Sequence, residues 1–217
     1  MTGTGDGVVA KLAGTYEMET YRAFERAMRN RPALFVDIGA AEGFYVSAFA
    51  RAVPGVRVIA YEAKEEWRHR IRRSAERNGV ASRCDLRGFC DPAEFRRLLG
   101  EAGKEPIFIL MDIEGGEFDL LNEETLPLLG HAELLVELHE SESREPGDAL
   151  AEMFRRTHAV ELIWAKGSRS LEDVCSPWWK LACSLLPPVR RRLDEGRAYK
   201  MRWMHAVPRP AAGAAGV

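Results

Sequence analysis

Short apolar runs rich in β-branched residues alternate with longer amphipathic stretches along most of the chain. Such alternation is typical of a parallel sheet that is buried between two layers of helices. The predicted strands are 34–38, 56–61, 83–88, 106–112, 132–139, 159–165 and 198–207. The predicted helices between them are 43–52, 64–78, 92–102, 117–129 and 147–156. The pattern therefore predicts a doubly wound, mostly parallel, seven-stranded α/β sheet of the Rossmann-like type.

Two segments interrupt this regular alternation. An amphipathic helix at about 16–29 precedes the first strand, so residues 1–30 are expected to cover one end of the sheet. Residues 166–197, rich in Trp, Pro and Arg, form an insertion before the last strand and are expected to cover the substrate. The small residues of 210–217 predict a disordered tail. Residues 1–209 are then expected to form a single domain, because this length suits one core rather than two.

Composition and charge restrict the classes of partner. The chain has 31 Lys and Arg residues against 33 Asp and Glu residues, so there is no basic excess for a nucleic-acid backbone. No run of about 18 apolar residues predicts a membrane span, and the first residues lack the apolar core of a signal peptide. A cytoplasmic enzyme is therefore expected. The four cysteines lack metal-finger spacing and are expected to be reduced structural thiols. Nothing in the pattern indicates the oligomeric state.

The segment FVDIGAAEGFYVSAFA, residues 35–50, carries the first candidate binding site. It joins a predicted strand to a predicted helix through Gly39 and Gly43. In open parallel sheets, ligands bind beyond the carboxyl ends of the strands, and the first strand-to-helix turn borders that crevice. Glycine allows a tight turn, and the amides at a helix start can receive an anion. The turn is consistent with a bound ligand, although a simple ligand-free connection would show the same residues.

A carboxylate after the second strand indicates what such a ligand contains. Glu62 follows Gly39 by 23 positions, where these folds set an acid against the two hydroxyls of a ribose. Asp37 and Glu42 flank the glycines, and their charges would repel the pyrophosphate of a dinucleotide. Ala41 also replaces the middle glycine of the dinucleotide motif. Because S-adenosylmethionine carries a sulfonium and an ammonium group, nearby acids favour it as the ligand.

Five motifs, in order, resemble those of class I S-adenosylmethionine-dependent methyltransferases: VDIGAAEG, AYEA, NGV...LRGFCD, ILMDIEGGEFDLL and LLVELHE. The motif DIEGGE is similar to that of the FkbM-like branch, and the resemblance covers about residues 15–165. The resemblance implies that the methionine part contacts Asp37, Gly39, Ala40 and Gly43. It also implies that the ribose contacts Glu62 and Ala63, and that the adenine edge contacts Phe89 and Cys90. Many relatives carry an acid after the third strand, where this chain has the segment 88–91. Backbone groups or Asp91 would then contact the adenine.

A second set of polar residues follows the fourth and fifth predicted strands. Strand parity places Asp112 and Glu114 on one side at the rim, and Glu137 with His139 on one side of the neighbouring strand. Asp112 or His139 could accept the proton of an acceptor hydroxyl or ammonium group. Alternatively, Asp112, Glu137 and His139 could hold a magnesium, manganese or iron ion that acidifies the acceptor. Glu117 is expected only to favour the positive start of the next helix.

The motifs and the resemblance together predict methyl transfer from S-adenosylmethionine to an oxygen of a small molecule, such as a sugar or a secondary metabolite. A nitrogen acceptor is less favoured, and a protein side chain stays open as the acceptor. Two alternatives are a non-catalytic S-adenosylmethionine-binding module and a metal-dependent enzyme of other chemistry. A nicotinamide-dependent oxidoreductase is disfavoured by Asp37, Ala41 and Glu42.

Overall fold

The computed structural model describes residues 11, 16–139, 146–164 and 201–210, whose strands form one sheet. The strand order is β3-β2-β1-β4-β5-β7-β6. The strands are β1 (Leu34–Ile38), β2 (Arg57–Tyr61), β3 (Cys84–Arg87), β4 (Ile107–Met111), β5 (Ala132–Leu138), β6 (His158–Trp164) and β7 (Arg202–Pro208). Strands β1 to β5 pair in parallel, whereas β7 is antiparallel to both β5 and β6. The predicted mostly parallel, seven-stranded α/β sheet is therefore confirmed.

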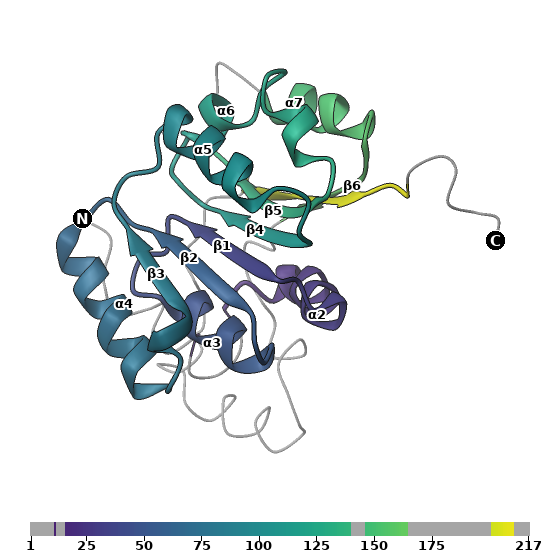
Figure 1. The fold of residues 1–217 in the computed structure, drawn as a ribbon. Coiled ribbons are helices and arrows are strands. Elements are labelled where there is room, and N and C mark those ends of the chain that lie inside the picture. The colour runs from purple at the N-terminus through teal and green to yellow at the C-terminus, as the bar shows by residue number, and fades with distance from the viewer. Residues whose placement is uncertain (1–10, 12–15, 140–145, 165–200, 211–217) are drawn as a thin grey trace, which may run out of the picture.

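Helices cover both faces of the sheet (Figure 1). Helices α2, α3 and α4 lie on one face, and α5, α6 and α7 lie on the other. Their bounds are α2 (Tyr21–Asn30), α3 (Phe44–Ala52), α4 (Glu65–Arg77), α5 (Pro92–Ala102), α6 (Glu117–Leu120) and α7 (Pro146–Arg155). Short 3-10 helices also occur: η1 (Met18–Thr20), η2 (Ala81–Arg83) and η3 (Leu126–Leu129). The amphipathic helix expected before the first strand is thus η1 followed by α2.

The core consists of two apolar clusters, one on each face of the sheet. Alternate residues of β1 enter different clusters, because successive strand side chains point to opposite faces. Leu34 and Val36 pack on the side of α5 and α7, whereas Phe35 packs on the side of α2 and α3. Phe35 stacks on Phe49 and Phe108 with ring centroids 4.4 and 5.6 Å apart. Burial of each such side chain stabilises the fold by roughly 1.5–3 kcal/mol, and it fixes the carboxyl ends of β1 and β4 side by side.

The segment expected to form one helix at 117–129 does not do so. Helix α6 ends at Leu120, and η3 begins only at Leu126. Between them the Asn122 side chain accepts hydrogen bonds from the backbone N–H groups of Glu124 and Thr125. The Thr125 hydroxyl in turn accepts from the N–H of Asn122. These side-chain bonds satisfy the backbone without a helix, and they outweigh the apolar periodicity.

Several expectations lie outside the described residues. These are 1–10 of the N-terminal cover, the insertion 166–197, residues 211–217 of the tail, and Cys175 and Cys183. Cys84 and Cys90 form no disulfide. None of the helices in the described part of the chain combines the length and the apolar content needed to cross a membrane.

Candidate active site

The turn after β1 is packed directly against the residue that follows β4. Gly39 has φ +92°, and a Cβ built on it would lie 1.8 Å from the carbonyl oxygen of Asp112. The N–H groups of Gly39 and Ala40 both donate to the Tyr61 carbonyl at 3.0 Å, and the N–H of Asp112 donates to the Ile38 carbonyl at 2.9 Å. Close backbone packing therefore requires Gly39, independently of any ligand.

A cavity of about 480 Å³ opens where β1, β2 and β4 end. This volume lies in the range of ligand pockets, and the position is the one that open α/β sheets use for ligands. The residues predicted to bind cofactor or to react that line it are Gly39, Glu62, Ala63, Phe89, Cys90 and Asp112. The structure thus places the residues predicted to bind ribose and adenine in one cavity with Asp112, which was predicted to take part in the reaction.

Glu62 is held in the wall of this cavity by two backbone donors. Its Oε2 accepts from the N–H of Ala41 at 2.9 Å, and its Oε1 accepts from the N–H of Lys64 at 2.8 Å. The Arg68 guanidinium donates to the carbonyls of Glu62 and Ala63, both at 2.7 Å, which fixes the backbone. Because each carboxylate oxygen has two lone pairs, Glu62 can still accept from the hydroxyls of a ligand.

The side of the cavity predicted to contact adenine carries an exposed aromatic ring, Phe89. Phe89 is 75% exposed and stands in the loop between β3 and α5. Cys90 beside it is buried, and burial raises the pKa of its thiol to about 12, with Glu94 and Asp91 adding to the effect. This thiol stays protonated and is no nucleophile. Asp91 accepts from the N–H of Glu94 at 2.8 Å, so one of its oxygens already caps α5.

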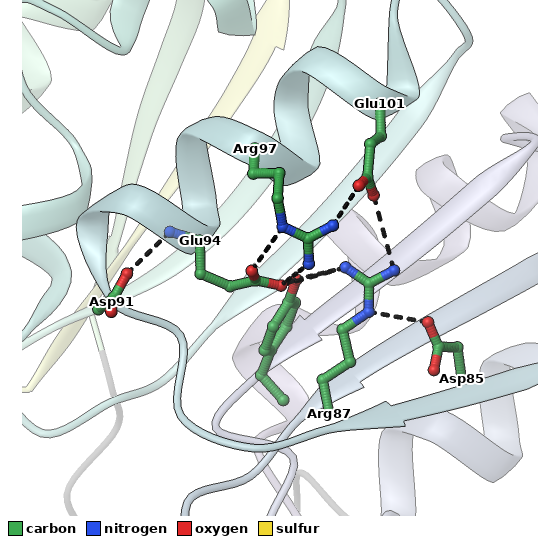
Figure 2. Close-up of polar contacts among 7 residues, drawn as sticks. Asp85, Arg87, Asp91, Glu94, Arg97 and Glu101 are labelled. Atoms are coloured by element: carbon green, nitrogen blue, oxygen red, sulfur yellow. Dashed lines mark hydrogen bonds and ion pairs between the residues drawn. The ribbon is translucent and has the colours of Figure 1, made fainter.

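An ion-pair network holds both ends of this loop (Figure 2). Arg87, at the end of β3, lies between Asp85, Glu94 and Glu101, at distances of 2.8, 3.2 and 3.7 Å. The buried Tyr61 hydroxyl donates to Glu94 at 2.7 Å and accepts from Arg87 at 3.0 Å. Because the network joins β2, β3 and α5, it fixes the loop that carries Phe89.

Asp37 lies near the turn but does not line the cavity. It is 2% exposed on the sheet face that Phe35 shares, and its Oδ2 has no hydrogen-bond partner. Burial raises the pKa of Asp37, and the charges of Asp112, Glu17, Glu62 and Glu42 raise it further. The turn therefore stands in a negative field that favours a positively charged ligand. Of the other predicted methionine contacts, Ala40 is buried and Gly43, with φ +80°, packs against α4.

His139 lies among three carboxylates just past the end of β5. Its Nδ1 is 2.6 Å from Glu117 Oε1, and its Nε2 is 3.6 Å from both Asp112 Oδ1 and Glu114 Oε2. Burial lowers the pKa of His139, but the hydrogen bond and charge of Glu117, with Asp112 and Glu114, raise it above the ordinary value. The imidazole thus lies beside Asp112 and Glu114, which line the cavity, with Nε2 facing Asp112.

The structure does not bring Glu137 into this group. Among the described residues, the side chains whose ligand atoms lie within 4.8 Å of one another are Asp112, Glu114 and His139. Glu137 is buried within β5, opposite Trp203 of β7. Strand alternation ends with β5 at Leu138, so parity does not extend to His139, which faces α6 instead. The possible ligand set therefore contains Glu114 in place of the expected Glu137.

Glu117 was expected only to begin a helix, and it has a second role. It is the first residue of α6, and its carboxylate is fully buried against His139. Parity along a strand cannot reveal a contact made through a loop. The detectable signal was an acid five positions after Asp112, beyond a glycine pair that lets the chain turn back.

The strand order, the reversed β7 and the cavity at the carboxyl ends define a Rossmann-like α/β fold, which solved methyltransferase structures share. One similar structure is the O-methyltransferase TomG from Streptomyces achromogenes, involved in tomaymycin synthesis and solved with SAM. Its TM-score is 0.60 at 12% identity, over 96% of this chain and 92% of that one. An O-methyltransferase from Bacillus cereus, in complex with SAH, has a TM-score of 0.56 at 12% identity, over 95% and 92%.

A precorrin-6y C5,15-methyltransferase from Geobacter metallireducens is similar as well, with a TM-score of 0.54 at 12% identity, over 87% of this chain and 88% of that one. No protein-family model and no curated protein matches the sequence. At this level of identity, the similarities establish the methyltransferase fold.

Proposed function

We propose that the protein transfers a methyl group from S-adenosylmethionine to a hydroxyl oxygen of a small molecule. The observation that carries the proposal is one cavity lined both by Glu62 and Phe89 and by Asp112, whose carboxylate lies 3.6 Å from His139 Nε2. The proposed nucleoside site and the proposed proton acceptor are thus adjacent. The O-methyltransferase neighbours support oxygen as the target atom.

Each wall of the cavity suits one part of S-adenosylmethionine. The Glu62 carboxylate can accept hydrogen bonds from the ribose hydroxyls, as a charged acceptor held in place by Ala41 and Lys64. Phe89 and Trp67 offer aromatic surface to the adenine. The negative field around Asp37 favours the ammonium and sulfonium groups at the other end.

His139 and Asp112 are suited to accept the proton that an acceptor hydroxyl must lose. Bound S-adenosylmethionine supplies an electrophilic methyl carbon, which the acceptor oxygen attacks in line while the carbon–sulfur bond breaks. The neutral imidazole takes the hydroxyl proton at Nε2. The charges of Asp112 and Glu114, each 3.6 Å away, then stabilise the resulting imidazolium.

The acceptor is proposed from the motif DIEGGE. Asp112, Glu114 and Glu117 of this motif all surround His139. The motif favours the FkbM-like branch, whose members often modify sugars or secondary metabolites. The formal net charge of −2 also favours a small molecule over a nucleic acid.

A second candidate mechanism uses a divalent metal ion at the same place. Asp112, Glu114 and His139 offer two carboxylates and an imidazole within 4.8 Å, a donor set that suits magnesium, manganese or iron. Such an ion would acidify the acceptor hydroxyl directly. Titration with Mn²⁺, followed by electron paramagnetic resonance, tests it: saturable binding that Asp112→Asn abolishes supports the metal, and its absence supports His139 as the base.

Calorimetry and mass spectrometry together test the proposed function. S-adenosylmethionine and S-adenosylhomocysteine are expected to bind the full chain, and a nicotinamide dinucleotide is not. Incubation with isotopically labelled S-adenosylmethionine and a panel of hydroxylated sugars and metabolites should then give a labelled product. Binding of the dinucleotide in place of the two adenosyl compounds would overturn the proposal. Binding without transfer to any acceptor would favour a non-catalytic binding module.

A further inference from the structure

The contact between Glu117 and His139 occupies Nδ1 of the imidazole and leaves Nε2 beside Asp112 and Glu114, two residues that line the cavity. Glu117 Oε1 accepts from the N–H of Ile113 at 3.2 Å and lies 2.6 Å from His139 Nδ1. Because an ionised carboxylate can only accept hydrogen bonds, a charged Glu117 at this distance favours the tautomer that carries the imidazole proton on Nδ1. The lone pair of the neutral ring is then on Nε2, the nitrogen beside Asp112 and Glu114.

Stability does not explain this carboxylate. Glu117 is 0% exposed, and its Oε2 has no hydrogen-bond partner. A buried acceptor without a donor costs free energy, and a buried charge costs more unless it is fully paired. An apolar side chain, or an amide that could donate as well, would remove this cost. This cost is understandable if the function of the protein requires a negative charge at Nδ1 of His139.

The glycine pair before α6 makes the contact possible. Gly115 has φ +105°, and Glu114 before it has φ +56°, so the chain turns sharply after β4. This turn directs Glu114 to one nitrogen of His139 and Glu117 to the other. Glu117 itself does not line the cofactor cavity, whereas Gly116 does. Glu117 therefore acts on the cavity through its neighbours, namely His139 and the N–H of Ile113, which lines the cavity.

We propose that Glu117 is a positioning residue, which holds His139 in the tautomer that presents the Nε2 lone pair to the acceptor and stabilises the imidazolium that forms. The proposal rests on the proposed function in one respect, namely that His139 Nε2 accepts the proton of the acceptor. The geometry supports it, since the described charged groups that face the ring are Glu117 from α6 and Asp112 and Glu114 from the preceding loop.

Nuclear magnetic resonance of the full chain with ¹⁵N-labelled histidine tests the proposal without knowledge of the acceptor. The chain has five histidines, so His139 is assigned from the signal that His139→Gln removes. In the wild type, the ¹⁵N shifts should report a proton on Nδ1, and the midpoint of titration should lie above the ordinary value for histidine. Glu117→Gln keeps an acceptor but loses the charge, so the proton affinity of His139 should fall roughly tenfold or more.

Two further variants separate positioning from simple folding. Glu117→Ala removes the acceptor as well, so the two tautomers should become mixed. Glu124→Gln is the matched control, because Glu124 is exposed on the same connection and pairs with Arg96. It should leave the His139 titration unchanged. If the Glu117 variants do not fold, the tautomer and the titration midpoint of His139 in the wild type still test the proposal.

Two results would overturn the positioning role. One is a wild-type His139 that carries its proton on Nε2, and the other is a titration midpoint that Glu117→Gln does not change. S-adenosylmethionine affinity, measured in parallel, should be the same in Glu117→Gln and the wild type. If the wild type binds no S-adenosylmethionine, the proposed function fails, but the His139 titration still tests the pair. Once an acceptor is known, Glu117→Gln should lower kcat and shift its pH profile at an unchanged KM for S-adenosylmethionine.

Discussion

Replacement of Glu62 by alanine is the sharpest test of the proposed nucleoside site. The carboxylate is fixed by the N–H groups of Ala41 and Lys64, at 2.9 and 2.8 Å, with its remaining lone pairs available to the cavity. A hydrogen bond to a charged group contributes about 1.5–3 kcal/mol. Loss of the ribose contacts should therefore weaken S-adenosylmethionine and S-adenosylhomocysteine by about one to two decades in Kd.

The same change also removes the acceptor of the Ala41 N–H, so the two effects must be separated. Calorimetry with S-adenosylhomocysteine and with its 2′,3′-dideoxyribose analogue completes a double-mutant cycle. The analogue lacks the hydroxyls, so Glu62→Ala should weaken it much less than the parent compound. Glu66→Ala, an exposed acid on the first turn of α4, is the control and should change neither affinity. Equal affinity of the wild type and Glu62→Ala for the parent compound would refute the ribose contact.

Two other substitutions test the turn after β1. Gly39→Ala should lower the free energy of unfolding in urea by roughly 2–5 kcal/mol, because its Cβ would overlap the Asp112 carbonyl at an unfavourable φ. Gly79 also has a positive φ, but a Cβ there would meet open space, so Gly79→Ala should lower the free energy of unfolding by only about 1 kcal/mol. Equal losses of stability in the two variants would contradict the packing argument. Asp37→Asn removes an ionisable group whose charged form is disfavoured by burial and neighbouring acids, so it should raise Tm at neutral pH, and loss of its negative charge should weaken S-adenosylmethionine at pH values where the wild-type carboxylate is ionised. Because the folded-state pKa of Asp37 is raised, wild-type stability relative to Asp37→Asn should decline as pH rises from the unfolded-state pKa through the folded one. A constant difference across that pH range would count against the buried charge.

The amino-acid pattern determines the sheet well because its central strands are buried on both faces. Leu34–Ile38 and Ile107–Met111 are apolar at nearly every position, which surface strands are not. The cavity also joins five of the eight residues predicted to bind the cofactor, namely Gly39, Glu62, Ala63, Phe89 and Cys90. These residues follow strands directly, so the strand positions already place them near one edge of the sheet.

Contacts that depend on the conformation of loops could not be predicted from the periodicity of strands and helices. The Asn122 side chain interrupts the expected helix by bonding to its own backbone, although the apolar spacing continues. The contact of His139 with Glu117 depends on how two loops meet after β4 and β5, and a period of two residues carries no information about that. Glu137 fails to join His139 for the same reason, because the extended conformation ends between them.

The contact between Gly39 and the backbone of Asp112 couples the proposed binding of the methyl donor to the proposed acceptance of the proton. The peptide at Gly39, next to the proposed methyl donor, and the peptide at Asp112, which bears the carboxylate proposed to react, touch each other with no side chain between them. A shift of the end of β1 or of β4 would therefore displace both the proposed donor site and the proposed proton acceptor. We therefore expect substitutions that change the specificity for the acceptor to keep the contact between Gly39 and Asp112. Such substitutions should occur at residues farther from this contact.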